Sequence, residues 1–259
     1  MSIEITSTQN PRVKELLQLR KRSGREREKR FLIDGLRDLQ RAVASGVEIE
    51  AIYFCPDQVE PDSLSGLGPG IRVSPPILEK ITYRENAEGF VAVAHMRTHE
   101  LAQLTISEKP LILVAASIEK PGNLGAMLRT ADAAGVDALL VSKPAVDLYN
   151  PNVIRSSTGT VFSVPLAVAE GPVIRDWLDE RGICGIAALP GARESLYAAD
   201  LRGPLAFFLG REQDGLSPEW QAAASVHLAI PMQGLADSLN VSATAAILAY
   251  EAVRQRAGG

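Results

Sequence analysis

A buried strand and a long Ala-rich helix are joined by Ile230-Pro231-Met232-Gln233-Gly234-Leu235-Ala236-Asp237-Ser238-Leu239-Asn240-Val241-Ser242. The free amides at a helix start bind polar or anionic groups, and apolar Ile230, Met232 and Leu239 can line a pocket. The stretch therefore predicts a site for a nucleoside that carries an amino-acid tail. The alternative is that Ser238 or Asn240 serves only as the N-cap of the helix.

Other apolar runs precede this stretch and alternate with helical segments. The runs cover residues 111–116, 138–141, 163–168, 183–188, 205–209 and 226–230. Helices are expected over 124–134, 172–181 and 239–256. Continuous apolar strands that alternate with helices are typical of a mostly parallel sheet covered on both faces. The fold class is thus α/β, and a ligand is expected where the strands end.

A glycine-containing turn follows the strand 205–209. It reads Gly210-x-Glu212-x-x-Gly215, and such glycines allow positive φ angles and a close approach of the backbone to a ligand. Taken alone the pattern is weak, because many strands end in glycine before an acidic turn.

A polar residue and a cation accompany the helix that follows the first strand of this half. Asn123 either caps that helix or faces a site, and Arg129 either lies on its surface or reaches back toward the strand ends. If Arg129 reaches back toward the strand ends, its guanidinium suits a phosphate or a developing oxyanion.

The first part of the chain predicts a separate, smaller α/β unit. Strands are expected at 31–33, 51–54, 71–73 and 90–94, and helices at 13–19, 36–44 and 75–81. We predict an N-terminal domain over 1–100, a linker over 101–109 and a second domain over 110–259.

Charge is distributed unevenly along the chain. Residues 10–41 contain eleven Lys or Arg and five Asp or Glu, for a net charge of +6. The rest contains sixteen basic and twenty-six acidic residues, for a net charge of −10. The segment 10–41 is either a basic arm that meets phosphate or a solvated helix face with pairs such as Glu26–Arg30.

Several functional classes lack the patterns they require. His95, His99, His227, Cys55 and Cys184 form no metal-ligand motif, so no metal site is expected. Neither half has a G-x-G-x-x-G or a P-loop after its first strand, which argues against a nicotinamide oxidoreductase. No membrane-spanning run and no secretory signal are recognisable, so a cytoplasmic protein with reduced cysteines is expected.

Three motifs occur in one order and spacing. They are Asn123-x-Gly125-x-x-x-Arg129-x-Ala131, Leu209-Gly210-x-Glu212-x-x-Gly215-Leu216 and the stretch 230–242, with Arg155-Ser156-Ser157-Thr158-Gly159 between the first two. Together they resemble the SpoU (TrmH) family of the SPOUT methyltransferases over 110–256. Ser7-x-x-Asn10-Pro11 and Phe31-Leu32-Ile33-x-Gly35 resemble, more weakly, the family's N-terminal substrate-binding domain.

This resemblance implies an architecture and a cofactor. It implies a C-terminal α/β domain with a trefoil knot, a small N-terminal α/β RNA-binding domain similar to a ribosomal-protein fold, and a homodimer formed through the catalytic domain. S-adenosylmethionine is the implied cofactor, in contact with Ala188, Leu189, Pro190, Leu209, Gly210, Ile230, Met232 and Leu239.

The resemblance also implies roles for catalytic and RNA-binding residues. The implied catalytic set is Asn123, Arg129, Glu212, Ser238 and Asn240. For RNA contact, the basic segment offers Arg12, Lys14, Arg20, Lys21, Arg22, Arg25, Arg27, Lys29 and Arg30.

The expected activity is 2′-O-methylation of ribose in structured RNA, with large-subunit (23S) rRNA as the first choice of substrate. The alternatives are a transfer-RNA 2′-O-methyltransferase and a non-catalytic RNA-binding protein that kept the fold. Intact catalytic motifs favour the enzyme over the binding protein, because fold alone carries no function.

Overall fold

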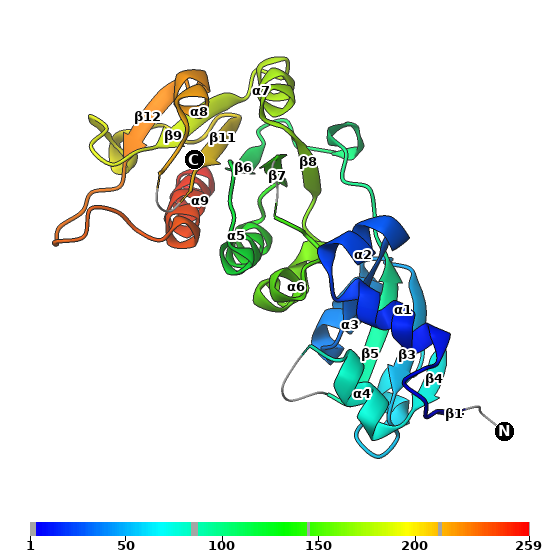
Figure 1. Ribbon diagram of the computed structural model, residues 1–259. Coiled ribbons are helices and arrows are strands. Elements are labelled where there is room, and N and C mark those ends of the chain that lie inside the picture. The colour runs from blue at the N-terminus through cyan, green and yellow to red at the C-terminus, as the bar shows by residue number, and fades with distance from the viewer. Residues whose placement is uncertain (1–3, 84–87, 144–145, 212–213, 259) are drawn as a thin grey trace. The chain divides into compact units, whose positions relative to one another are not determined.

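The computed structural model describes residues 4–83, 88–143, 146–211 and 214–258. The chain divides into two compact units, whose elements are labelled in Figure 1. Unit 1 comprises Met1–Thr98 and Asp147–Ser163, and unit 2 comprises His99–Val146 and Val164–Gly259. Residues 147–163 thus pack with unit 1. The division into 1–100, 101–109 and 110–259 stays a prediction.

In the described part of the chain, unit 1 is built on a mixed five-stranded sheet with the strand order β1-β4-β3-β5-β2. Its strands are β1 (Glu4–Ile5), β2 (Arg30–Ile33), β3 (Ile49–Phe54), β4 (Gly70–Val73) and β5 (Phe90–His95). Its helices and 3-10 turns are α1 (Pro11–Leu19), α2 (Arg22–Glu28), α3 (Leu36–Ala44), η1 (Pro61–Leu64), α4 (Pro75–Ile81), α6 (Pro151–Ser157) and η3 (Thr160–Phe162).

Both faces of the unit 1 sheet are covered, because successive side chains of a strand point to opposite sides. Leu32 of β2 belongs to a buried cluster with Val13 of α1 and Leu78 of α4. Its neighbour Phe31 is fully buried, with its ring centroid 4.4 Å from that of Tyr149 and 5.8 Å from that of Phe162. The segment 147–163 therefore completes the hydrophobic core of unit 1.

A buried ion pair also fastens this segment. The Arg25 side chain is 3% exposed, and its Nε donates to Asp147 Oδ2 at 2.9 Å, while Nη2 pairs with the same oxygen. Arg25 Nη1 donates to the carbonyl oxygens of Leu19 and Arg20 at 2.8 and 3.0 Å. Tyr83 donates to the same Leu19 oxygen, and burial raises the pKa of Tyr83 to about 12. The guanidinium thus has partners on every side.

Unit 2 contains a parallel sheet, seven-stranded over the described residues, with the order β10-β12-β9-β11-β6-β7-β8. Its strands are β6 (Leu111–Ala115), β7 (Ala138–Lys143), β8 (Leu166–Glu170), β9 (Cys184–Ala188), β10 (Glu194–Ser195), β11 (Leu205–Leu209) and β12 (Val226–Ala229). Its helices and 3-10 turns are η2 (Leu101–Gln103), α5 (Pro121–Ala134), α7 (Gly171–Asp179), η4 (Leu196–Ala198), α8 (Pro218–Ala223) and α9 (Val241–Ala257).

Helices lie on both faces of this sheet. Figure 1 shows α5 and α9 on one side of the strands and α7 and α8 on the other. A buried core joins β6, β7 and β11 to α7 and α8, and within it the ring of Phe208 meets that of Trp220 edge-on at 4.9 Å. The predicted fold class, an α/β chain with a mostly parallel sheet and a smaller N-terminal α/β unit, is confirmed.

The elements agree with the sequence-based expectations except where the pattern was short. The strand expected from 163 begins at Leu166, because residues 160–162 form the 3-10 turn η3. The helices α2, α6 and α8 were not predicted, since each is about two turns or shorter and shows little apolar periodicity. Among the described residues, no helix combines the length and apolar character needed to cross a membrane.

We expect Asp147→Ala to lower the free energy of unfolding by about 3–5 kcal/mol, because it leaves the buried Arg25 charge unpaired. Asp200→Ala is the control, since its pair with Arg202 is exposed and contributes little. Chemical denaturation of both variants measures the difference. Equal stability of the two variants would contradict the anchoring role of Asp147.

Candidate active site

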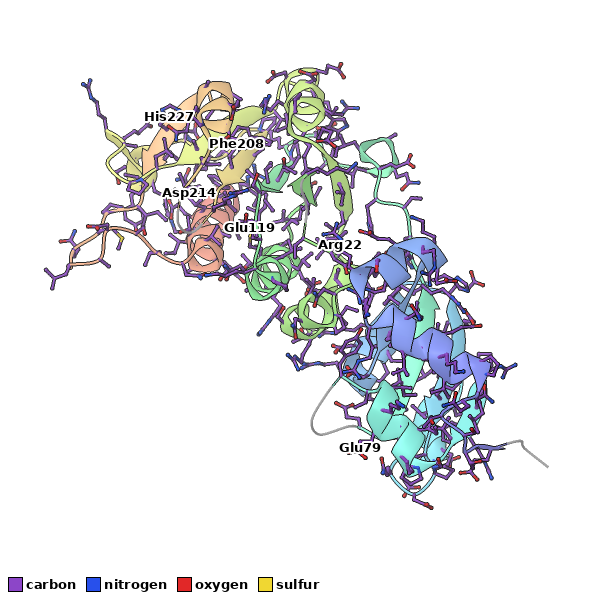
Figure 2. All side chains as sticks on the ribbon, in the orientation of Figure 1. Arg22, Glu79, Glu119, Phe208, Asp214 and His227 are labelled. Atoms are coloured by element: carbon purple, nitrogen blue, oxygen red, sulfur yellow. The ribbon has the colours of Figure 1, made fainter. Side chains whose placement is uncertain are left out.

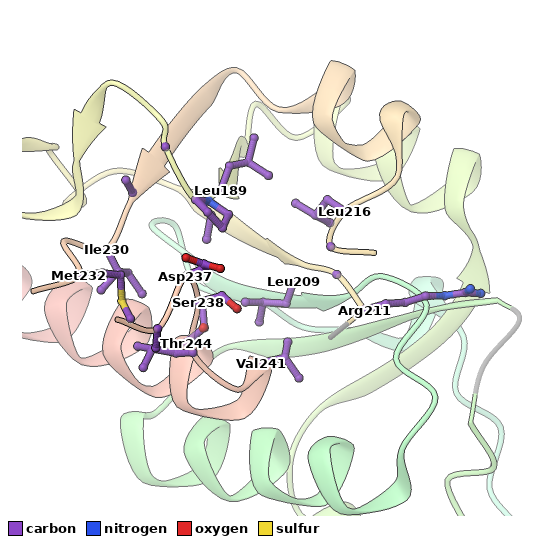
Figure 3. A pocket seen from close by; sticks show the side chains of 18 of the residues that line it. Leu189, Leu209, Arg211, Leu216, Ile230, Met232, Asp237, Ser238, Val241 and Thr244 are labelled. Carbon is purple, nitrogen blue, oxygen red and sulfur yellow. The ribbon is translucent and has the colours of Figure 1, made fainter. Parts of the chain in front are cut away.

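A cavity of about 800 Å³ lies at the carboxyl ends of β9, β11 and β12 (Figure 3). It is lined by the residues that follow these strands and by the start of α9. All of the residues predicted to contact the cofactor line it, namely Ala188, Leu189, Pro190, Leu209, Gly210, Ile230, Met232 and Leu239. The structure therefore brings this set together, and its role in cofactor binding stays a prediction.

The turn after β11 requires glycine at its first position. Arg211 and Gly215 exchange backbone hydrogen bonds of 2.9 and 3.0 Å, and Gly215 has a φ of +66°. A Cβ atom on Gly210 would lie 2.3 Å from the carbonyl carbon of Gly215. Gly210 thus lets the backbone fold tightly against the cavity.

Charged and polar side chains at or beside the cavity were missed by the sequence analysis. Arg211 Nη2 lies 3.1 Å from Glu119 Oε1, and Nη1 lies 3.9 Å from Asp214 Oδ2. Figure 2 labels the two carboxylates, and in Figure 3 the Arg211 side chain extends away from the other labelled lining side chains. Asp237 and Thr244 also line the cavity. Asp237 lies within the quoted stretch, and Thr244 is one turn past Asn240, so helix periodicity could have found it.

Two predicted catalytic residues are in contact. Asn240 Nδ2 donates to Asn123 Oδ1 at 3.3 Å, and Asn240 lies between the lining residues Leu239 and Val241. Asn240 is also the N-cap of α9, accepting from Ser242 N at 2.9 Å. The capping role and the site role considered for this residue therefore coexist.

Asn123 is not the N-cap of its helix. It is the third residue of α5, which begins at Pro121 and has Lys120 at the N-cap position. The capping alternative for Asn123 was wrong because the Lys-Pro pair starts the helix earlier. Ser238, a further predicted catalytic residue, lines the cavity.

Arg129 lies on α5, nearly two turns beyond Asn123, and its side chain is exposed. It has no ion pair with a carboxylate of the described residues. Its guanidinium is thus available to an anion. Glu212, the remaining predicted catalytic residue, lies outside the described residues.

The predicted RNA-binding residues other than Arg25 are of two kinds. Exposed side chains without a carboxylate partner among the described residues are Arg12, Lys14, Arg20, Lys21 and Lys29. Exposed or partly buried arginines are neutralised locally: Arg22 by Glu26, Arg27 by Glu28, and Arg30 by Glu15, Glu28 and Glu50.

Arg25 departs from the prediction that it contacts RNA, because its buried pair with Asp147 leaves no surface for a phosphate. The expected helix pair Glu26–Arg30 does not form either. The helix α2 ends at Glu28, and Arg30 already belongs to β2.

The fold and the cavity define an α/β protein with a cavity at the carboxyl edge of a parallel sheet, the place where such sheets bind ligands. Residues 110–250 match the model of the SpoU rRNA Methylase family, and residues 10–92 match that of the MRM3-like substrate binding domain. The first match alone covers more than half of the chain. The chain belongs to the SpoU rRNA methylase family, which confirms the resemblance seen in its motifs.

Curated relatives align over nearly the whole chain. It is 31% identical over 250 residues to the 23S rRNA (uridine(2479)-2'-O)-methyltransferase of Streptomyces viridochromogenes, covering 92% of this chain and 87% of that protein. It is 30% identical over 250 residues to the 23S rRNA (guanosine(2553)-2'-O)-methyltransferase RlmP of Bacillus subtilis, covering 95% of this chain and 98% of that protein.

Solved structures share the fold of the whole chain. The crystal structure of an RNA 2'-O ribose methyltransferase superposes with a TM-score of 0.87 at 44% identity, covering 98% of this chain and all of that one. The SpoU methyltransferase AviRb from Streptomyces viridochromogenes, solved in complex with AdoMet, gives a TM-score of 0.89 at 30% identity. The match covers 97% of this chain and all of that one.

We expect Gly210→Ala to lower the free energy of unfolding by about 1–3 kcal/mol, because the added methyl group overlaps the Gly215 backbone. Gly234→Ala is the matched control: Gly234 lines the same cavity, and a Cβ there meets no atom within 4 Å. Thermal unfolding of both variants measures the effect, and a Gly210→Ala protein as stable as the control would refute the close approach.

Proposed function

We propose that the protein transfers the methyl group of S-adenosylmethionine to a ribose 2′-hydroxyl of 23S rRNA. The observation that carries the proposal is the hydrogen bond between Asn123 and Asn240, the residue between Leu239 and Val241 in the lining of a cavity at three strand ends. Family membership and relatives named as 23S rRNA 2'-O-methyltransferases support it. The AdoMet complex of AviRb supports the choice of cofactor.

The residues of the cavity fit this cofactor. Apolar Leu209, Ile230 and Met232 suit an adenine ring, and the close approach at Gly210 leaves backbone groups within reach of polar atoms. Asp237 and Ser238 offer a carboxylate and a hydroxyl for the ribose and the amino-acid tail. When bound, S-adenosylmethionine supplies an electrophilic methyl group on a positively charged sulfur.

The chain's own residues position the attacking ribose. Bound S-adenosylmethionine would give its methyl group to the ribose 2′-oxygen and leave as S-adenosylhomocysteine, while the hydroxyl proton would pass to solvent water. Arg129 holds the adjacent phosphate and stabilises negative charge on the 2′-oxygen, because a guanidinium donates to two oxygens at once. Four further residues orient the ribose and its developing charge, namely Asn123, Glu212, Ser238 and Asn240. Arg129 is not assigned as the base, because a free guanidinium is a poor base.

Unit 1 supplies affinity for RNA. Exposed Arg12, Lys14, Arg20, Lys21 and Lys29 have no carboxylate partner among the described residues and are available to phosphates. The family-model match to a substrate binding domain supports this role.

We further propose a homodimer formed through unit 2, and a cytoplasmic location. Leu235 is fully exposed, and Met232, Leu239 and Tyr250 are each at least about a third exposed, all on α9 or on the stretch before it. Exposed large apolar side chains of this kind suit a partner surface. A monomer by analytical ultracentrifugation at assay concentration contradicts the dimer, and cell fractionation tests the location.

Incubation with methyl-labelled S-adenosylmethionine and unmodified 23S rRNA, followed by alkaline digestion, tests the reaction. A 2′-O-methyl group blocks cleavage of its own phosphodiester, so label is expected in an alkali-resistant dinucleotide. Label in mononucleotides would mean base methylation and would overturn the mechanism. Transfer RNA as the only acceptor would correct the substrate class.

Arg129→Lys is expected to lower kcat at least about tenfold, because lysine keeps the charge but lacks the planar fork of donors. Affinity for S-adenosylmethionine should stay unchanged, as Arg129 does not line the cavity. Arg202→Lys, on an exposed loop before β11, is the control. Steady-state assays give kcat, and full turnover by Arg129→Lys would exclude the proposed role.

A further inference from the structure

Three exposed arginines of unit 1 lie on α3 and α6. Arg37 and Arg41 are one turn apart on α3, and Arg155 is in the last turn of α6. Residues one turn apart share a helix face. Arg37 and Arg41 belong to the region matched as a substrate binding domain, whereas Arg155 lies within the methylase match.

Contacts between side chain and backbone bring the two helices together. Arg41 Nη1 donates to the carbonyl oxygen of Thr158 at 2.5 Å and to its Oγ1 at 2.9 Å. A Cβ on Gly159 would lie 3.2 Å from the Arg41 side chain, so the two pack closely. Figure 1 shows α3 beside α6. The C-terminal end of α6, with Arg155, therefore borders the arginine face of α3.

No carboxylate of the described residues neutralises the charges on this surface. None of Arg37, Arg41 and Arg155 has an ion pair with a carboxylate of the described residues; Arg155 Nη2 donates to Asn152 Oδ1 at 2.7 Å. Two carboxylates near α3 are hidden or engaged: Asp38 of α3 is 4% exposed, and Glu88, from the segment before β5, accepts from the backbone of Leu36 at 2.7 Å.

The basic segment of α2 and β2 differs in this respect. Arg22, Arg25, Arg27 and Arg30 each have a carboxylate partner, so much of their charge is balanced inside unit 1. An RNA phosphate must displace such a partner to bind, whereas an unpaired guanidinium binds it directly. The arginines of the α3–α6 surface thus have a stronger claim to phosphate contacts than these four arginines.

We propose that Arg37, Arg41 and Arg155 form a phosphate-binding surface for the RNA substrate, built jointly by α3 and by the segment 147–163. The inference rests on the proposed function and extends it, since it assigns RNA contact to a helix outside the substrate-binding match. The buried pair of Asp147 with Arg25 and the packing of Tyr149 on Phe31 hold α6 in place for this role.

Filter binding of an unmodified 23S rRNA transcript, over a range of salt concentrations, tests the surface in the full-length protein. The double variant Arg37→Glu, Arg155→Glu is expected to raise Kd about tenfold or more and to reduce the slope of log affinity against log salt by about two. The variant Arg37→Gln, Arg155→Gln, which removes charge without reversing it, should show a smaller loss in the same direction. Arg41 is kept, because its bonds to Thr158 hold the surface together.

Arg72→Glu is the matched control. Arg72 is an exposed arginine of the same unit, lies on β4 away from β2 in the strand order, and has no ion pair with a described carboxylate. Its Kd should match that of the wild type, and S-adenosylmethionine affinity should be unchanged in all variants.

The outcomes separate this inference from the proposed function. Wild-type affinity in both double variants, or an equal loss in Arg72→Glu, overturns the surface even if the protein methylates rRNA. A wild-type protein that binds the transcript and shows the predicted losses but transfers no methyl group supports the surface and overturns the proposed function.

Discussion

Neighbouring parallel strands end at the same edge of a sheet, and the site depends on this constraint. β12, β9 and β11 are adjacent in the sheet although other segments separate them in the chain. Their following residues therefore meet around one cavity. The next strand in the sheet, β6, leads into α5 and so brings Asn123 to Asn240 at the start of α9. Strand order alone assembles residues that lie more than a hundred positions apart.

The helix start then sets the orientation of one site residue. The side-chain oxygen of Asn240 accepts from the backbone and the hydroxyl of Ser242, at 2.9 and 2.6 Å. With its oxygen engaged, the amide nitrogen is left to donate toward Asn123. A capping interaction, which stabilises α9, thus also fixes the direction of a donor in the site. Stability and function act through the same side chain.

Elements with a strong local pattern were predictable, and contacts between distant segments were not. Apolar runs located β6, β7, β9 and β11, and the strand-end motifs located the cavity residues. The burial of Arg25 was hidden, because its partner Asp147 is more than a hundred residues away and a charged side chain normally lies in water. Arg211 was missed for a related reason: its partner Glu119 comes from another loop.

The placement of residues 147–163 shows how closely the two halves of the chain depend on each other. The chain leaves unit 2 after β7, completes the core of unit 1 and returns to form β8. A fragment that ended before β6 would expose Phe31 and leave Arg25 buried without its carboxylate. Both changes are unfavourable, since one exposes a large apolar ring and the other leaves a buried charge without its partner. Unit 1 therefore includes residues from the middle of the methylase region, and these residues contribute to its core.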